Sequence, residues 1–318
     1  MTSSRILLLG SSGFLGSNVA NALAVEDSAS LTLHVSSGDA PNVPGAVVKA
    51  DLTDSDSVAR ILRATRPDLI INCAALADVD ACEAMPDLAA ALNHHLPAQL
   101  GAYASATGAR FVHVSTDAVF AGDAEAYTEE SVVSPVNVYG RTKRDGEVAV
   151  ALADPEALIA RTNIVGWSPS GRRSLLEYFY NRLSRSESAP GYTDLTFRPL
   201  PVQRFWPICS HLLGSGGTGV AHVTGPELLS KYEFGRRVAA VFGFDPGLVI
   251  PTESSFDRAR APRAAHLDVR PSRLSGELFG GPESTLVGGL RQLRESRARR
   301  GIPADHTGMS AAQQETQR

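Results

Sequence analysis

Short apolar runs alternate with segments of helical periodicity through the first half of the chain. Five runs have the length and composition of buried strands: Arg5–Leu9, Leu31–Val35, Leu69–Asn72, Phe111–Val114 and Ala157–Arg161. Segments with helical spacing lie between them, at about 14–24, 56–65, 86–107 and 139–152. This alternation predicts an α/β fold with a doubly wound parallel sheet, helices on both faces and right-handed crossovers.

The alternation stops near residue 166. Residues 168–173 are rich in turn formers, and a helical stretch with aromatic residues at 178–180 follows them. Ser230–Phe242 also has helical spacing, and Ser230 is placed to cap that helix. The last residues are polar and lack an apolar period, which is typical of disorder. We predict three parts: a first domain at 1–165, a smaller C-terminal lobe at 166–295 partly interleaved with it, and a disordered tail at 296–318.

A glycine-rich turn follows the first apolar run and opens the first helix. It reads Gly10-Ser-Ser-Gly13-Phe-Leu-Gly16. Gly10 would permit a tight turn, Gly13 would let the backbone approach a pyrophosphate, and Gly16 would let helix and strand pack closely. The helix N-terminus then offers N–H donors to phosphate oxygens. In this strand–turn–helix context the pattern predicts a Rossmann dinucleotide site; the alternative is a turn without a ligand.

A hydroxyl, a phenol and an ammonium follow later in the sequence. Thr116 lies just after the fourth apolar run, and Tyr139 and Lys143 are four residues apart on a predicted helix. Residues at that spacing share one helix face. A free tyrosine has a pKa of ~10, and a cation one turn away would lower it. Thr116 could hydrogen-bond the same substrate oxygen, so the three groups could move a proton onto a carbonyl oxygen.

Composition fits a soluble enzyme. The chain has 318 residues, 43% hydrophobic and 20% charged, and a formal charge of -4, which gives no footprint for nucleic acid or an anionic membrane. Its three cysteines are odd in number and lack metal-ligand spacing, so we expect neither a disulfide framework nor a metal site. Without a secretory signal or a transmembrane stretch, we expect a cytoplasmic protein.

These motifs together resemble a known family, the extended short-chain dehydrogenases/reductases, and within it the dTDP-4-dehydrorhamnose reductase branch. The glycine pattern is the extended form of the family's fingerprint, and Asn72-Cys73-Ala74-Ala75 resembles its cofactor-lining segment. Ser115-Thr116-Asp117-Ala118-Val-Phe resembles the branch's Ser-Thr-Asp-Tyr-Val-Phe, and Pro135-Val-Asn-Val-Tyr139-Gly-x-x-Lys143-x-x-Gly-Glu147 is closer still. The resemblance is dense from residue 5 to about 165 and thinner to about 275.

The resemblance implies roles for individual residues. Thr116, Tyr139 and Lys143 would be catalytic, and Asn93 would complete a catalytic tetrad through a water. Asp51 and Leu52 follow a further, strand-like run that lies between Leu31–Val35 and Leu69–Asn72, and they would contact adenine. The expected cofactor contacts are Gly10, Ser12, Gly13, Phe14, Leu15, Gly16, Ser36, Asp51, Leu52, Cys73, Ala74, Ala75, Tyr139 and Lys143.

The C-terminal lobe would then bind a nucleotide-sugar substrate. Arg172 and Arg173 are candidates for its diphosphate, because a guanidinium fork suits phosphate oxygens, although such loop arginines also occur as plain surface residues. Asp117 would either contact substrate or cap its loop. The expected substrate contacts are Asp117, Ala118, Thr162, Asn163, Arg172 and Arg173.

The end of the second apolar run bears on cofactor preference. An acidic residue there would hold the adenine ribose of NAD. The sequence has Val35-Ser36-Ser37 at that place, with no carboxylate before Asp39 and no arginine beside it. Because no negative charge would repel a 2′-phosphate, NADP(H) is favoured over NAD(H).

Three functional hypotheses remain open. The first is NADPH-dependent reduction of a keto group on a nucleotide-activated deoxysugar. The second is a nucleotide-sugar epimerase or dehydratase; its dehydratase form is disfavoured because Asp117 is followed by Ala118 where a carboxylate pair would stand. The third is a regulatory subunit, disfavoured because Thr116, Tyr139 and Lys143 are all present. Ala118 and the apolar segment 199–207 depart from the branch and leave the exact sugar open. A homodimer, frequent among relatives, is open too.

Overall fold

The computed structural model describes residues 4–25, 29–36, 38–254, 261–274, 281 and 284–299. Its centre is a seven-stranded sheet in the order β11-β6-β5-β4-β1-β2-β3, and every neighbouring pair is parallel. The strands are β1 (Ser4–Leu9), β2 (Ala29–Val35), β3 (Ala46–Lys49), β4 (Leu69–Asn72), β5 (Arg110–Thr116), β6 (Leu158–Thr162) and β11 (Gly219–Val223). The predicted doubly wound α/β fold is confirmed.

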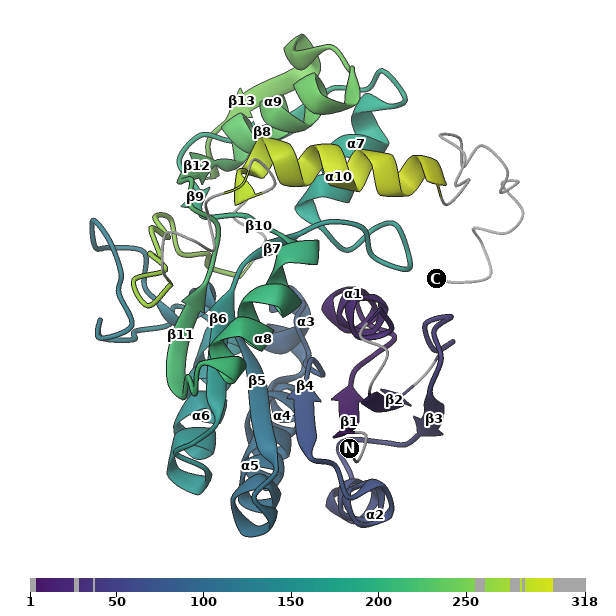
Figure 1. Ribbon diagram of the computed structural model, residues 1–318. Helices are drawn as coiled ribbons and strands as arrows, with labels where there is room; N and C mark the ends of the chain where they lie inside the picture. Colours follow the sequence, from purple (N-terminus) through teal and green to yellow (C-terminus); the bar gives the residue numbers. More distant parts are fainter. Residues whose placement is uncertain are drawn as a thin grey trace.

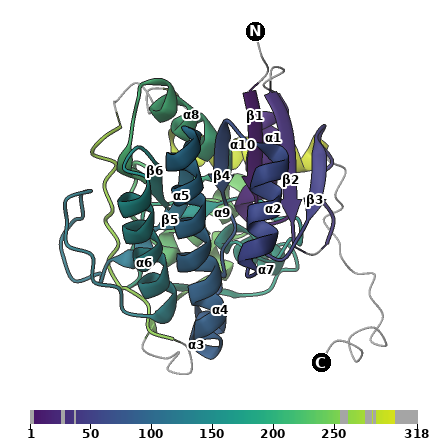
Figure 2. The same ribbon diagram turned by 90° about the horizontal axis from the view of Figure 1, so that it is seen from below.

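Helices cover both faces of this sheet (Figures 1 and 2). On one face, α1 (Phe14–Leu23) packs beside α8 (Phe205–Gly214). On the other face lie α2 (Ser55–Thr65), α5 (Leu96–Thr107) and α6 (Val138–Ala153), with α5 between its two neighbours. The two layers correspond to two separate apolar clusters, because strands buried on both faces carry apolar side chains on each.

A long helical segment leads into α5. It begins with α3 (Val79–Ala84) and α4 (Pro86–Ala90) and passes through a π-helical turn, η1 (Ala91–His95). Such turns insert an extra residue in an α-helix and occur often at functional sites. A short 3-10 turn, η2 (Asp117–Val119), follows β5.

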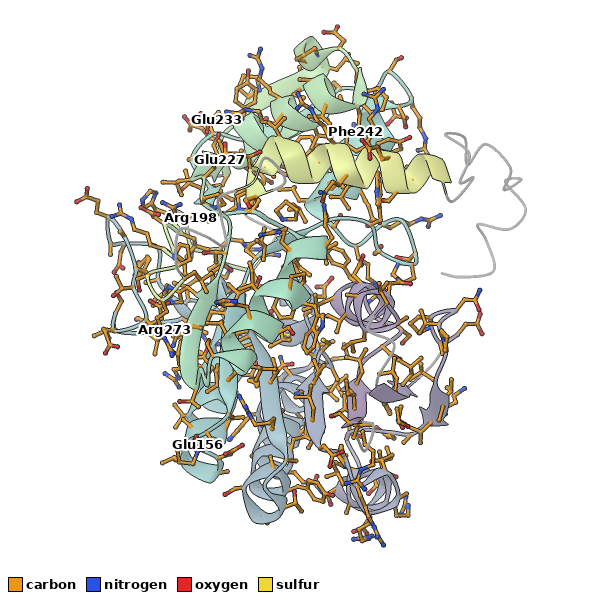
Figure 3. All side chains as sticks on the ribbon, in the orientation of Figure 1. Glu156, Arg198, Glu227, Glu233, Phe242 and Arg273 are labelled. Carbon is orange, nitrogen blue, oxygen red and sulfur yellow. The ribbon has the colours of Figure 1, made fainter. Side chains whose placement is uncertain are left out.

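The second half of the chain forms the lobe above the sheet in Figure 1. Its helices are α7 (Leu175–Leu183), α9 (Lys231–Phe242) and α10 (Leu286–Arg299), with 3-10 turns η3 (Val202–Arg204) and η4 (Pro246–Leu248). Its short strands pair as β8 (Ala189–Tyr192) with β13 (Val249–Thr252), β9 (Thr196–Phe197) with β12 (Leu229–Ser230), and β7 (Ile164–Val165) with β10 (Leu200–Pro201). In Figure 3, Glu227, Glu233 and Phe242 lie in this lobe, and Glu156 lies at the far end of the sheet.

Local signals explain where the lobe helices begin. Ser230 caps α9 as predicted, and Glu233 completes a reciprocal capping box with it. Ser174 and Glu177 form the same arrangement at α7. Gly243 ends α9 with a φ of 78°, a conformation that a glycine adopts without steric cost.

Helix α10 extends past residue 296, where the tail is predicted to begin. Helix α10 continues through residues 296–299, because Leu286, Leu290 and Leu293 give it a buried stripe. The guanidinium of Arg297 also lies over the rings of Trp167 and Tyr180, at 4.6 and 4.4 Å from their centroids. The predicted start at residue 296 is therefore wrong, and residues 300–318 lie outside the described residues.

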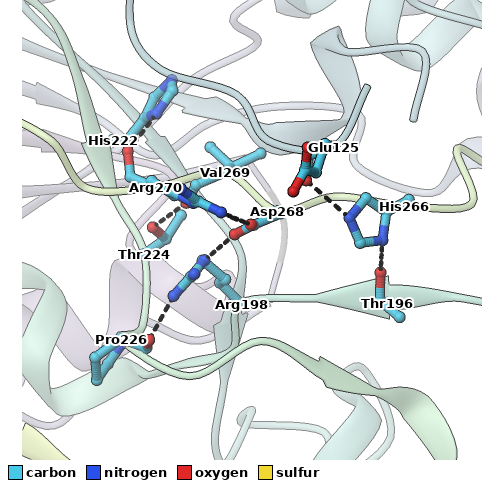
Figure 4. A network of polar contacts seen from close by, with 10 residues as sticks. All are labelled: Glu125, Thr196, Arg198, His222, Thr224, Pro226, His266, Asp268, Val269 and Arg270. Carbon is cyan, nitrogen blue, oxygen red and sulfur yellow. Dashed lines mark hydrogen bonds and ion pairs between the residues drawn. The ribbon is translucent and has the colours of Figure 1, made fainter. Parts of the chain in front are cut away.

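A connecting segment, residues 261–274, joins the lobe to the sheet (Figure 4). Thr224, just after β11, donates from its hydroxyl to the Val269 carbonyl at 2.7 Å. Asp268 accepts hydrogen bonds from Arg198 of the lobe and from Arg270. The strand β11 itself belongs to the second half of the sequence but pairs with β6. The two predicted parts are thus interleaved, and the boundary at residue 165 stays a prediction.

Candidate active site

The carboxyl end of β5 and the start of α6 are held in direct contact. A Cβ at Gly140 would lie 2.3 Å from the Ala118 carbonyl oxygen, so only glycine allows this approach. Asn137 caps α6 by accepting from the Gly140 N–H at 2.8 Å. The structure therefore brings Tyr139 close to Thr116, whose hydroxyl acts to lower the pKa of the phenol and donates to Asp117 Oδ1 at 3.2 Å.

Burial dominates the acidity of Tyr139. Burial, together with smaller contributions from the charges of Asp117 and Cys82, raises the pKa of the phenol to about 12, and the interaction with the Thr116 hydroxyl offsets only part of the rise. We expected Lys143 to lower this pKa. Instead, its Nζ turns toward the sheet, donates to the Val114 carbonyl at 2.6 Å and lies 3.4 Å from His113 Nε2.

Lys143 itself is almost fully buried, with 2% of its surface exposed. Burial lowers the pKa of this ammonium to about 8, while the carboxylate of Glu147, one turn further along α6, partly restores it. His113 is fully buried too, and burial together with the charge of Lys143 holds its pKa well below the ordinary value. A neutral imidazole thus lies beside the ammonium.

Asn93 ties α6 to the loop after β4. Its Oδ1 accepts from the Leu76 N–H at 2.9 Å, and its Nδ2 donates to the Leu76 carbonyl and to Thr142 Oγ1 at 3.0 and 3.1 Å. Both amide hydrogens are used, so the side chain fixes the position of α6 one residue before Lys143. The expected water-mediated role of Asn93 stays a prediction.

The glycine turn forms a cradle that side chains would fill. Gly10 has a φ of 74°, and a Cβ there would lie 2.7 Å from the Ala74 nitrogen. A Cβ at Gly16 would lie 2.1 Å from the Gly10 carbonyl oxygen. Gly13 is the N-cap of α1, which has neither a side-chain cap nor an acidic residue in its first turn. The backbone N–H groups in the first turn of α1 and the positive end of this helix fit the pyrophosphate of a dinucleotide.

The other expected cofactor residues differ in how far they are buried. Leu15 and Leu52 are buried in the two apolar clusters, so their side chains pack in the core. Ser36 is exposed at the end of β2. Asp51 accepts from both the Thr53 N–H and hydroxyl, at 2.8 and 2.7 Å. The remaining positions are half-buried on the turn or after β4: Ser12, Phe14, Cys73, Ala74 and Ala75.

Asp117 lies buried beside the hydroxyls of Thr116 and Tyr139. Its Oδ2 accepts from Asn163 Nδ2 at 2.6 Å, and burial raises its pKa. The ammonium of Lys231, the first residue of α9, opposes that rise, which places a cation of the lobe near this carboxylate. Ala118 is half-buried next to it, and its N–H donates to Thr116 Oγ1. Thr162 instead donates its hydroxyl to the Val223 carbonyl at 2.7 Å, so that group is used within the sheet.

Within the described residues, no hydrogen bond or ion pair joins the side chain of Arg172 or Arg173 to this site. Both are exposed on the loop before α7. The Trp167 carbonyl at the start of that loop accepts from Asn18 of α1 at 3.0 Å, which places this end of the loop over α1. Thr116 and Tyr139 lie at β5 and α6, and β4 separates β5 from β1. A substrate role for the two arginines stays a prediction.

Sequence reasoning missed a buried charge network beneath the site. Arg161 of β6 donates twice to Glu147 of α6, at 2.9 and 2.7 Å, and Ser115 donates to the same carboxylate. His222 Nδ1 donates to the Arg270 carbonyl, so its bare Nε2 faces Arg161 Nη1 at 3.5 Å. An arginine inside an apolar strand was the signal, because buried charges need partners.

Two classes of site are absent from the described part of the chain. There, no cluster of three or more histidine, cysteine, aspartate or glutamate side chains could hold a metal ion. Among those same residues, no helix is long and apolar enough to span a bilayer.

Comparison with known proteins identifies the class and then the family. The fold and the similar proteins are those of a short-chain dehydrogenase/reductase type of enzyme, as expected. The profile of the RmlD substrate binding domain matches residues 4–280, and the chain belongs to that family.

Three curated relatives that are similar to this chain carry different names. A probable low-salt glycan biosynthesis reductase of Haloferax volcanii is 33% identical over 89% of this chain and 95% of its own length. A dTDP-4-dehydrorhamnose reductase of Mycobacterium tuberculosis is 32% identical over 83% of this chain and 84% of its own. Methionine adenosyltransferase 2 subunit beta of Rattus norvegicus is 31% identical over 69% and 68%.

Solved structures agree with the fold. A dTDP-4-dehydrorhamnose reductase of Clostridium acetobutylicum superposes with a TM-score of 0.77 and 26% identity, covering 92% of this chain and 99% of that one. Another, from Bacillus anthracis in complex with NADP, gives a TM-score of 0.78 at 23% identity, covering 93% and 99%.

Proposed function

We propose that this protein reduces a keto group on a nucleotide-activated deoxysugar with NADPH. The observation that carries the proposal is the convergence of Thr116, Tyr139 and Lys143 at the carboxyl edge of the sheet, beside the glycine cradle. The dTDP-4-dehydrorhamnose reductases among the relatives support this reaction and this substrate class.

The cradle would hold the cofactor. The α1 N-terminus and the backbone at Gly10 and Gly13 suit its pyrophosphate, and Ala74 and Ala75 line the path toward Lys143. When bound, the nicotinamide supplies the hydride. Lys143 carries three N–H donors, of which the Val114 carbonyl takes one, so others can reach ribose hydroxyls.

Tyr139 would donate the proton. Because burial raises the pKa of its phenol to about 12, Tyr139 is protonated at neutral pH and ready to protonate a forming alkoxide. The phenolate left behind needs stabilisation in a buried place. The Thr116 hydroxyl, which donates to Asp117 Oδ1 in the free protein, would turn its hydrogen toward the phenolate.

For the diphosphate of the substrate we propose Lys231 in place of the two arginines. Its Nζ lies 5.9 Å from the centroid of the Tyr192 ring, and its charge acts on both Asp117 and Asp194. The first turn of α9 thus delivers a cation from the lobe toward the catalytic edge. Lys231→Met should raise KM for the nucleotide sugar on the order of tenfold and leave KM for NADPH unchanged.

The testing experiment mixes purified protein with NADPH and dTDP-4-keto-6-deoxy sugars. Cofactor absorbance and product identity are followed together. We expect one NADPH oxidised for each sugar reduced, and the product stereochemistry would name the sugar. Sugar conversion without net NADPH oxidation would replace the proposal with an epimerase or dehydratase. Cofactor binding without any turnover across these sugars would favour a regulatory subunit; one relative is named as a subunit, methionine adenosyltransferase 2 subunit beta.

A further inference from the structure

Lys49 is the last residue of β3, at the carboxyl edge where the adenine end of a dinucleotide would lie. In the parallel register, Lys49 pairs directly with Val35, the last residue of β2. Sequence reasoning found no cation at the end of β2, because 14 positions separate these two residues along the chain. The sheet makes them neighbours, about 4.8 Å apart in strand spacing.

The side chain of Lys49 projects on the face that carries α1. Paired residues of parallel strands point to the same face, and residues two apart on one strand do so as well. Val35 therefore shares a face with Leu33, which packs in the apolar cluster that includes Val19 and Leu23 of α1. The glycine cradle at the α1 N-terminus lies on this same face.

The glycine turn also touches the end of β2 directly. The N–H and the hydroxyl of Ser11 both donate to the His34 carbonyl, at 2.9 and 2.8 Å. The pyrophosphate cradle, Ser36 and Lys49 thus follow one another along the carboxyl edge of the sheet. An adenine ribose held between the cradle and residues 51–52 would have its 2′ position near the end of β2.

Charges around this place leave Lys49 available. Lys49 is exposed, and within the described residues no hydrogen bond or ion pair engages its ammonium. Asp51 is committed to Thr53, and Ser36 carries no charge. Asp39, four residues beyond β2 and exposed, is the opposing carboxylate.

We infer that Lys49 binds the 2′-phosphate of the cofactor and sets a preference for NADP(H) over NAD(H). The inference rests on the proposed dinucleotide site and goes beyond it, since it assigns the preference to one residue on the third strand. A compact ammonium on a flexible four-carbon stem suits a phosphate monoester at a solvated strand end.

The test measures binding without the nicotinamide or the sugar. Adenosine 2′,5′-bisphosphate and adenosine 5′-monophosphate are titrated into the full chain by calorimetry. We expect the bisphosphate to bind about three- to tenfold more tightly, as for an exposed charge pair. Lys49→Met should remove this difference and leave the affinity for the monophosphate unchanged, and Lys49→Arg should keep it.

Two further variants make the outcome specific. Arg291→Met removes one positive charge from an exposed position on α10. It should leave the ratio of the affinities for the bisphosphate and the monophosphate unchanged. Asp39→Asn should increase the affinity for the bisphosphate. If Lys49→Met leaves the ratio unchanged, or if Asp39→Asn weakens monophosphate binding, Lys49 does not select the cofactor. If neither adenosine ligand binds the unmodified protein, the dinucleotide site itself is wrong and both proposals fall.

Discussion

At the scale of single residues, the site depends on one phenol kept protonated by burial. Tyr139→Phe removes the proton donor but keeps the ring that packs there. We expect turnover to fall by about 10²- to 10⁴-fold, the usual contribution of general acid catalysis. NADPH affinity, measured by fluorescence titration, should change little, because the proposed pyrophosphate contacts at Gly10, Gly13 and the α1 N-terminus do not use the phenol hydroxyl. A variant with comparable turnover would remove Tyr139 from the mechanism.

The ammonium of Lys143 should set the alkaline limit of the reaction. Its pKa is lowered to about 8, so the charge is present below that pH and is lost as pH rises through it. Tyr139, with a pKa of about 12, does not titrate in the same range. Because the proposed contacts of Lys143 with the nicotinamide ribose need this cation, kcat should decline above about pH 8. A kcat profile flat to pH 10 would contradict this role.

At the scale of elements, α6 is anchored to β6 by the Glu147–Arg161 pair, with both side chains 5% exposed. Glu147→Gln leaves a buried guanidinium without its charged partner, which should cost about 3–5 kcal/mol of unfolding free energy. Urea unfolding measures this loss. The double variant Glu147→Leu with Arg161→Met should recover much of it, because apolar pairs of similar volume can replace buried ion pairs. Equal instability of single and double variants would contradict a charge penalty.

The Glu147–Arg161 pair should also affect the pH dependence of kcat. Glu147 partly restores the pKa of Lys143 that burial depresses. Glu147→Gln should therefore move the alkaline limb of the kcat profile to lower pH, where a purely structural loss would only reduce its height. Assays that are normalised to the folded fraction of the variant separate a shift of the alkaline limb from a loss of height.

Elements with local signals were predictable from sequence. The glycine turn, the Ser230 cap and the strands β1, β2, β4, β5 and β6 follow from patterns within a few residues of each other. Contacts made only by the fold were not: β11 joins β6 from 57 residues or more away, and Lys49 reaches β2 only through pairing. Arg172 and Arg173 had suitable chemistry, but the loop that carries them begins over α1. Lys231 gave no local signal, because its place depends on how the lobe folds back.

At the scale of the whole molecule, residues 261–274 connect three parts that must stay in register. Asp268 joins this segment to Arg198 of the lobe, Thr224 joins it to the end of β11, and Asn137 donates from its amide to the Pro262 carbonyl at 2.8 Å. Asn137 is also the cap of α6, two residues before Tyr139. The segment therefore links the lobe, the sheet and the catalytic helix.

Asp268→Ala tests this linkage. It leaves Arg198 and Arg270 without the carboxylate that they share, so amide hydrogen exchange should accelerate across 261–274 while β1, β4 and β5 stay protected. Since the lobe would then sit less firmly over the catalytic edge, KM for the nucleotide sugar should rise more than KM for NADPH, whose cradle lies on α1. Glu156→Ala, at the opposite end of the sheet, is the matched control (Figure 3). Faster exchange throughout the sheet, or equal rises in both KM values, would mean that Asp268 supports the whole fold rather than the approach of the lobe to its substrate.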